Sequence, residues 1–265
     1  MSASMPIIEL KNVHKSFGAF VAVEDLSLDV AEGEIVGLLG RTGAGKSTVL
    51  NLVMGTIAPE SGQIRVAGFD PNAQFRELKG RIAVSFQTDR LLPWRTAVEN
   101  AELGLLILGV PAAEARDRAL KWLERVNLKG AEGKYVHELS GGMRQRVSLA
   151  RALAVDPAIV FLDESFSQLD HATATKLRRD FYRIAKEFGK TCLFVTHRIQ
   201  DAIDIADRAV VLGPGARIVL VKEMSPRLRS DTAAVKDCEA VIAQAMGGEE
   251  EEEDIASFHG GRPAS

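Results

Sequence analysis

The sequence GRTGAGKS occupies residues 40–47, between an apolar run at residues 35–39 and a helical pattern that follows Gly45. Glycine lets successive backbone N–H groups turn inward around an anion, because no Cβ atom blocks the tight path. The start of the helix adds its positive end to the same site. We therefore predict a phosphate-binding loop in which Lys46 contacts the β- and γ-phosphates and Ser47 binds Mg²⁺. The alternative, a chance glycine-rich turn, has odds on the order of one in a hundred in a chain of this length.

Length and charge narrow the class of protein. The chain has 265 residues and a net charge of −3, with both signs mixed throughout. This length fits one large domain or two small ones, and the charge does not indicate a general polyanion binder, so we expect no nucleic acid partner. Cys192 and Cys238 lack metal or redox spacing, which fits a reducing compartment. We see no signal peptide, and the longest apolar stretch, residues 103–110, is too short to span a bilayer.

The order of apolar patterns predicts an α/β fold. Strands alternating with helices imply a mostly parallel sheet, and the β-rich start implies an antiparallel part. Residues 90–138 have helical character, with Thr96 as a cap and Pro111 at a helix start, so they predict a helical subdomain. We expect one helix from Thr96 towards Leu108. The other expected strands are residues 7–10, 26–30, 63–66, 81–86, 158–162 and 191–195, and the other expected helices are residues 140–155, 171–187 and 199–206.

The last forty residues have a different character. Residues 226–246 predict a helix with one apolar side, and residues 249–254 are six consecutive acidic residues. Such a run is usually a solvated, disordered tail. We therefore expect one domain over residues 1–225, a helical segment over 226–246 and an acidic tail over 247–265.

Two further motifs carry chemistry. Asp163 and Glu164 follow the apolar run 158–162, and a buried parallel strand delivers its last side chains to the sheet edge where ligands bind. There Asp163 can hold Mg²⁺ and Glu164 can act as a general base towards water. Ser140-Gly141-Gly142 opens a helix and makes a second anion site. One nucleotide needs one phosphate loop, so this second site is best explained by a nucleotide held by another copy of the chain.

In this order the motifs resemble the ATP-binding-cassette (ABC) ATPases, the nucleotide-hydrolysing subunits of ABC transporters, over about residues 7–225. The resemblance implies a P-loop NTPase fold: an ABC ATPase core with a mostly parallel sheet, an antiparallel β subdomain and a helical subdomain. The matching segments are Gly40–Ser47 (Walker A), Gln87 (Q-loop), residues 139–145 (signature), residues 161–164 (Walker B), Asp170 (D-loop) and His197 (switch).

The resemblance also implies roles and partners. Two copies would close head to tail around two ATP molecules, at the cytoplasmic face of the inner membrane, on permease subunits and indirectly a solute-binding protein. Glu164, His197 and Gln87 would be catalytic, and Ser47, Gln87 and Asp163 would hold Mg²⁺. Phe17 would stack on adenine, with core packing as the alternative for this side chain. The residues expected to bind ATP are Phe17, Gly40, Arg41, Thr42, Gly43, Ala44, Gly45, Lys46, Ser47, Thr48, Ser140, Gly141, Gly142 and Asp170.

The segment LLPW at residues 91–94 is similar to importers of the nitrate, sulfonate and taurine group. We therefore expect an importer ATPase. The alternatives are the ATPase of a lipid transporter or exporter, a soluble ABC protein without transport, and a degenerate cassette that only binds. The sequence departs from the family pattern in three places: Ser165 where proline is usual, the pair Ser167-Gln168 before Leu169-Asp170, and Arg198 where importers often carry aspartate.

Overall fold

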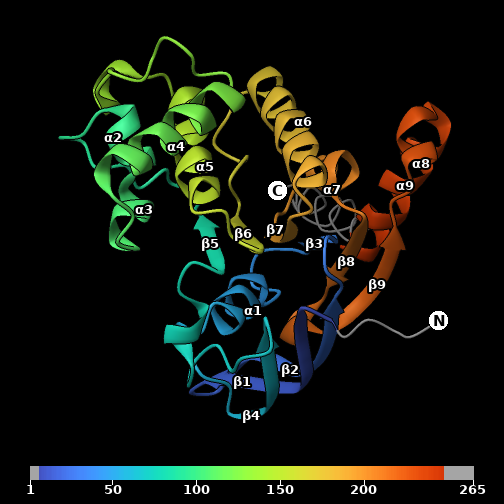
Figure 1. The fold of residues 1–265 in the computed structure, drawn as a ribbon. Helices are drawn as coiled ribbons and strands as arrows, with labels where there is room; N and C mark the ends of the chain where they lie inside the picture. Colours follow the sequence, from blue (N-terminus) through green and yellow to red (C-terminus); the bar gives the residue numbers. More distant parts are fainter. Residues whose placement is uncertain (1–5, 248–265) are drawn as a thin grey trace, which may run out of the picture.

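Two sheets enclose the helix that follows the phosphate loop (Figure 1). The computed structural model describes residues 6–247. The larger sheet has the order β5-β6-β7-β3-β8-β9, in which only the β8–β9 pair is antiparallel. The smaller sheet has the order β2-β1-β4 and is antiparallel. Their strands are β1 Ile8–Phe17, β2 Phe20–Val30, β3 Ile35–Leu39, β4 Ser61–Val66, β5 Ile82–Ser85, β6 Ile159–Asp163, β7 Thr191–Val195, β8 Arg208–Leu212 and β9 Ile218–Glu223.

Helix α1 (Lys46–Val53) lies in the core between the two sheets. Val49, Leu50, Leu52 and Val53 are at most 1% exposed and pack against apolar residues of both sheets. Burying each such side chain stabilises the fold by about 1.5–3 kcal/mol. The apolar side of α1 thus fixes the direction of the helix, and with it the position of the phosphate loop at its start.

The opposite face of the larger sheet is covered by helices (Figure 1). Cys192 and Phe194 of β7 share this core with α5, α6, α7 and α9. In the described residues, 6–247, no helix is long and apolar enough to cross a membrane. The helices are α2 Ala97–Ala101, α3 Leu103–Ile107, α4 Ala112–Arg125, α5 Gly141–Ala154, α6 His171–Glu187, α7 Ile199–Ile205, α8 Pro226–Ser230 and α9 Thr232–Ala245, with 3-10 turns at Phe75–Leu78 (η1), Val136–Glu138 (η2) and Pro214–Ala216 (η3).

Most of the predicted elements are present, and two predicted helices are wrong in extent. The helix that Thr96 caps ends at Ala101, and α3 follows as a separate helix after Glu102. The helix predicted over 226–246 is two helices, because the Asp231 carboxylate accepts hydrogen bonds from the N–H groups of Ala233 and Ala234 and starts α9 anew. The acidic tail, apart from Gly247, lies outside the described residues.

A buried ion pair network joins two of the covering helices. Arg178 of α6 is fully buried. Its Nη1 lies 2.8 Å from Asp201 Oδ1 and its Nε lies 2.7 Å from Asp204 Oδ2, and both aspartates belong to α7. Burial raises the pKa of the Asp201 carboxyl, whereas a hydrogen bond from Thr196 and the charge of Arg178 lower it. Removing one partner of such a pair leaves a buried charge uncompensated.

We therefore predict that Arg178→Ala lowers the free energy of unfolding by about 3–5 kcal/mol in a denaturant titration. Arg183→Ala is the matched control, since Arg183 is an exposed arginine of the same helix and its loss should change stability by at most about 0.5 kcal/mol. Equal stability of the two variants would contradict a structural role for the network.

Candidate functional site

The loop after β3 follows a path that only glycine permits at its closest approach. Gly45 has a φ of 85°, and a Cβ atom there would lie 2.3 Å from the backbone oxygen of Ala22 and 3.0 Å from Ala216 Cβ. Gly43 has a φ of 87° and faces open space. The tight, glycine-dependent turn that the motif predicts is therefore present, and β2 and η3 support it from outside.

The interior of this loop is built for an anion. Lys46 is 7% exposed, and its Nζ donates to the backbone oxygens of Gly40 at 2.6 Å and Arg41 at 2.9 Å. Burial lowers the pKa of Lys46, and the nearby Glu164 carboxylate raises it. Helix α1 starts without a side-chain cap and without an acidic residue in its first turn. The ammonium group and the uncapped helix start are donors that fit phosphate oxygens.

Three predicted catalytic residues come together at the carboxyl edge of the larger sheet. Glu164 directly follows β6, and its N–H donates to Val195 O at 3.1 Å in a left-handed conformation with a φ of 45°. Its Oε1 lies 3.3 Å from Nδ1 of His197, which follows β7. Its Oε2 accepts a hydrogen bond of 3.3 Å from Gln87 Nε2 after β5. Three segments distant in the sequence therefore meet at one carboxylate.

The predicted metal ligands offer hard oxygen donors at the same edge. Burial, and then the neighbouring Glu164, raise the pKa of the Asp163 carboxyl, and a divalent cation would offset both effects. Ser47 is exposed at the start of α1, and Gln87 is exposed after β5. This donor set fits Mg²⁺. Within residues 6–247, no three His, Cys, Asp or Glu side chains gather into a ready-made metal site. A metal held here would therefore share its ligands with phosphate, as Mg²⁺ usually does.

The signature segment stands apart from the phosphate loop. Ser140 caps α5, its Oγ accepting a hydrogen bond from the Met143 N–H at 3.3 Å. Figure 1 shows α5 and α1 in different parts of the molecule. A Cβ atom on Gly142 would lie 2.5 Å from Thr173 Cγ2 of α6, so a larger residue there would have to displace the Thr173 side chain. The two helix starts that the sequence predicts to bind anions are therefore in separate parts of the chain.

The remaining residues predicted to bind ATP are Phe17, Asp170 and the other residues of the loop. Phe17, at the β1–β2 turn, is 51% exposed with Lys15 Nζ 5.4 Å from its ring centre, so the alternative of core packing is wrong for this side chain. Asp170 caps α6, and hydrogen bonds from Thr173 lower the pKa of its carboxyl. Of the other predicted loop residues, Arg41 and Thr42 are exposed, Ala44 is buried and Thr48 is half-buried.

Two of the residues that depart from the family pattern, Ser165 and Ser167, stabilise the turn that carries Glu164. The buried Ser165 hydroxyl donates to Ser85 O of β5 at 2.9 Å, and the Ser167 hydroxyl donates to Glu164 O at 2.8 Å. Arg198 starts α7, and its N–H donates to the Thr196 hydroxyl at 3.0 Å. Ser165 and Ser167 therefore supply hydrogen bonds that hold the Glu164 turn.

Sequence reasoning missed a clamp on the segment that follows Gln87. Arg144 Nε donates to Asp89 Oδ2 at 3.0 Å. The Arg151 guanidinium donates to Asp89 O at 2.7 Å and to Arg90 O at 2.8 Å. Burial lowers the pKa of Arg151, which the Asp89 carboxylate opposes. These contacts tie the Gln87 segment to α5, the helix that the signature starts. They join residues about sixty positions apart, so no short motif could have indicated them.

The Asn100 side chain forms hydrogen bonds with the LLPW segment, and the tryptophan of this segment is exposed. The buried Asn100 side chain accepts from the Leu92 N–H at 2.7 Å, and its Nδ2 donates to the oxygens of Leu92 and Thr96. Leu91 is 8% exposed and belongs to the core, whereas Trp94 is 71% exposed. Core packing therefore explains Leu91 but not Trp94.

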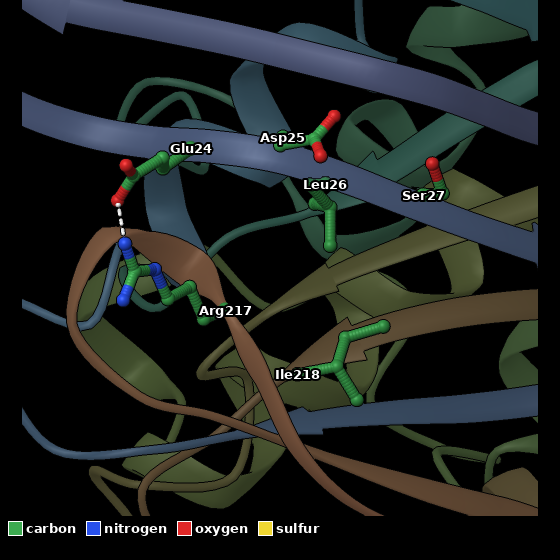
Figure 2. Close-up of a pocket in the computed structure, with 6 residues that line it drawn as sticks. All are labelled: Glu24, Asp25, Leu26, Ser27, Arg217 and Ile218. Carbon is green, nitrogen blue, oxygen red and sulfur yellow. Dashed lines mark hydrogen bonds and ion pairs between the residues drawn. The ribbon is translucent and has the colours of Figure 1, made fainter.

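The hollow drawn in Figure 2, of about 440 Å³, contains none of the predicted site residues. It lies between β2 and the start of β9, where Arg217 Nη2 lies 2.7 Å from Glu24 Oε2. Both side chains are largely exposed, so this ion pair contributes little.

The clamp predicts the effect of Arg151→Ala on the segment that follows Gln87. Loss of two hydrogen bonds from a charged donor should speed amide hydrogen exchange over residues 87–92 by about tenfold or more. Arg118→Ala, which removes a partly exposed i,i+4 pair on α4, is the control and should leave that exchange unchanged. Unchanged exchange in both variants would refute the clamp.

The chain is similar to known proteins over most of its length. A family model described as ABC transporter matches residues 23–167. The taurine import ATP-binding protein TauB of Yersinia pestis bv. Antiqua (strain Antiqua) is 40% identical over 220 residues, which cover 83% of this chain and 84% of that protein. The sulfate/thiosulfate import ATP-binding protein CysA 1 of Rhizobium meliloti (strain 1021) is 41% identical over 214 residues, which cover 79% of this chain and 61% of that protein.

A solved structure extends the likeness to three dimensions. The dimeric post-hydrolysis state of the ATP-binding cassette MJ0796, bound to ADP and Pi, superposes with a TM-score of 0.73 and 32% identity. The match covers 82% of this chain and 99% of that one.

Proposed function

Because the chain belongs to the ABC transporter family, we propose that it hydrolyses ATP to power solute import through a separate membrane permease. The chain is an ATP-binding subunit and an ATPase of this family. The observation that carries the proposal is the meeting of Gln87, Glu164 and His197 at the sheet edge, in electrostatic reach of Lys46 in the loop.

The residues divide the chemistry of hydrolysis between them. In our proposal, Lys46 and the start of α1 hold the phosphates, and exposed Phe17 stacks on the adenine ring. Glu164 takes the proton from the water that attacks the γ-phosphate, while His197 and Gln87 hold that water and phosphate in place. Ser47, Gln87 and Asp163 would hold Mg²⁺, which neutralises phosphate charge when bound.

A second copy of the chain would give the predicted anion site at the start of α5 a nucleotide to bind. We infer that Ser140, Gly141 and Gly142 of one copy contact the γ-phosphate on the loop of the other, and that Asp170 lies near this contact. The separation of α5 from α1 within one chain supports this arrangement (Figure 1). The dimeric form of MJ0796 with ADP and Pi is a related case.

The proposed transport direction is import, and the substrate group is the finer proposal. The relatives named above are import ATP-binding proteins for taurine and for sulfate or thiosulfate, and LLPW favours the nitrate, sulfonate and taurine group. Trp94, exposed beside the clamped Gln87 segment, is a suitable contact for a permease. The proposed location is the cytoplasmic face of the inner membrane, with a solute-binding protein as an indirect partner.

Glu164→Gln tests the proposed base. The variant should lose about 10²–10⁴-fold in steady-state ATP hydrolysis with Mg²⁺ present, because an amide cannot accept the proton of water. ATP should still bind, since Glu164 does not hold the phosphates. Glu187→Gln, an exposed change at the end of α6, is the control. Full activity of Glu164→Gln would remove this residue from the chemistry.

Lys46→Ala tests the phosphate loop itself. Loss of the buried ammonium group should weaken ATP binding by about ten- to hundredfold in a calorimetric titration, because hydrogen bonds to charged groups contribute about 1.5–3 kcal/mol. Lys176→Ala, an exposed lysine of α6, should bind ATP as the unchanged chain does. Unaltered affinity in Lys46→Ala would count against the site.

A further inference from the structure

The switch residue His197 is held in place mainly by the backbone on either side of it. Its side chain is 50% exposed, and the contact of its Nδ1 with Glu164 Oε1 is long at 3.3 Å. Strand β7 ends two residues before it at Val195, and helix α7 begins two residues after it at Ile199. Because a half-exposed ring makes few packing contacts, the position of the imidazole depends on how firmly α7 is held.

Helix α7 depends on contacts from other elements. It has seven residues, whereas isolated helices shorter than about 12 residues are marginal in water. Its N-cap residue, Arg198, forms no side-chain capping hydrogen bond, and its last turn carries no basic residue. The last carbonyl groups of a helix have no partner within the helix and form its negative end. The groups that bind these carbonyls therefore contribute strongly to fixing α7.

Arg229 of α8 binds the C-terminal end of α7. Its Nε donates to Ile203 O at 2.7 Å, and its Nη2 donates to Ala206 O. Its Nη1 donates to the Tyr182 hydroxyl of α6 at 3.1 Å, and its Cζ lies 4.8 Å from the centre of the Tyr182 ring. One half-buried guanidinium thus supplies the cation that the last turn of α7 lacks, and it joins this turn to α6.

The segment that carries Arg229 is itself anchored on both sides of α8. Before α8, Met224 is 3% exposed, and its N–H donates to Asp207 O at 2.7 Å. After α8, Cys238 and Ile242 of α9 are buried in the core that α9 shares with α6 and α7. Figure 1 shows α7 between α6 and α9. The guanidinium therefore binds α7 from a fixed position.

We propose that Arg229 is a positioning residue for ATP hydrolysis, which fixes His197 through α7 and does not itself touch the nucleotide. The catalytic unit then extends beyond residue 225 into the C-terminal helical segment. A displacement of about 1 Å in a reacting group can cost about a hundredfold in rate, so contacts far from the chemistry affect turnover. This inference rests on the proposed function of His197 and adds a residue that supports it.

Arg229→Ala tests the inference in the full chain with ATP and Mg²⁺. We expect kcat to fall about tenfold while the KM for ATP changes less than about twofold, because the residues proposed to hold the phosphates lie in the loop before α1. Arg229→Lys should restore most of the loss, since an ammonium group can also donate to the two carbonyl groups. Arg227→Ala is the matched control, because Arg227 is an exposed arginine of the same helix, and it should leave kcat unchanged.

A double-mutant cycle separates positioning from a general loss of structure. If Arg229 acts through His197, Arg229→Ala should lower the rate by less than about twofold in a His197→Ala background, measured as single-turnover hydrolysis. A loss by the same factor in both backgrounds would mean that Arg229 only stabilises the fold, and it would overturn the inference. If Arg229→Ala does not fold, Arg229→Gln, which retains an amide donor, takes its place in the same cycle.

Amide hydrogen exchange gives a readout that does not require activity. Arg229→Ala should speed exchange over residues 199–206 by about tenfold, because it removes two hydrogen bonds from a charged donor to the end of α7. Unchanged exchange there would overturn the inference. If His197→Ala instead hydrolysed ATP as fast as the unchanged chain, the proposed role of His197 would be wrong, and Arg229 could not act through it.

Discussion

The left-handed turn at Gly45 is the constraint on which the rest of the site depends. It brings the loop so close to Ala22 of β2 and Ala216 of η3 that no side chain fits between them. The antiparallel sheet and the segment before β9 are thereby held to the end of the central strand β3. Because α1 is packed between the two sheets, the direction of its positive N-terminal end is fixed. Lys46 is held inside the loop.

The carboxyl edge of the larger sheet completes the site through bonds that are mostly outside the motifs. Ser165 and Ser167 hold the strained turn at Glu164. The Thr196 hydroxyl donates to Asp201 at 2.6 Å, and Asp201 pairs with the buried Arg178, so the segment before His197 is fixed to α6 and α7. Hydrogen-bonded, buried networks of this kind give a site one geometry.

The sequence was sufficient for elements with strong local signals. The bounds predicted for β7 and α6 agree with the structure, because an apolar run between turns and a capped amphipathic pattern are local features. Strands β8 and β9 were not predicted. The helix predicted from Thr96 towards Leu108 is divided at Glu102 into α2 and α3. Gln87, Glu164 and His197 were chosen from motifs as catalytic candidates, and the structure brings these three side chains together. The clamp of Asp89 by Arg144 depends on packing between distant segments, which spacing cannot encode.

The central claim is that one copy's phosphate loop and another's signature helix bind the same nucleotide. Light scattering on the Glu164→Gln chain measures this directly, with and without ATP and Mg²⁺. We expect the mass to double with ATP, and Ser140→Arg in the same background to remain monomeric while still binding ATP. A mass that doubles despite Ser140→Arg, or loss of ATP binding by that monomer, would contradict the shared site.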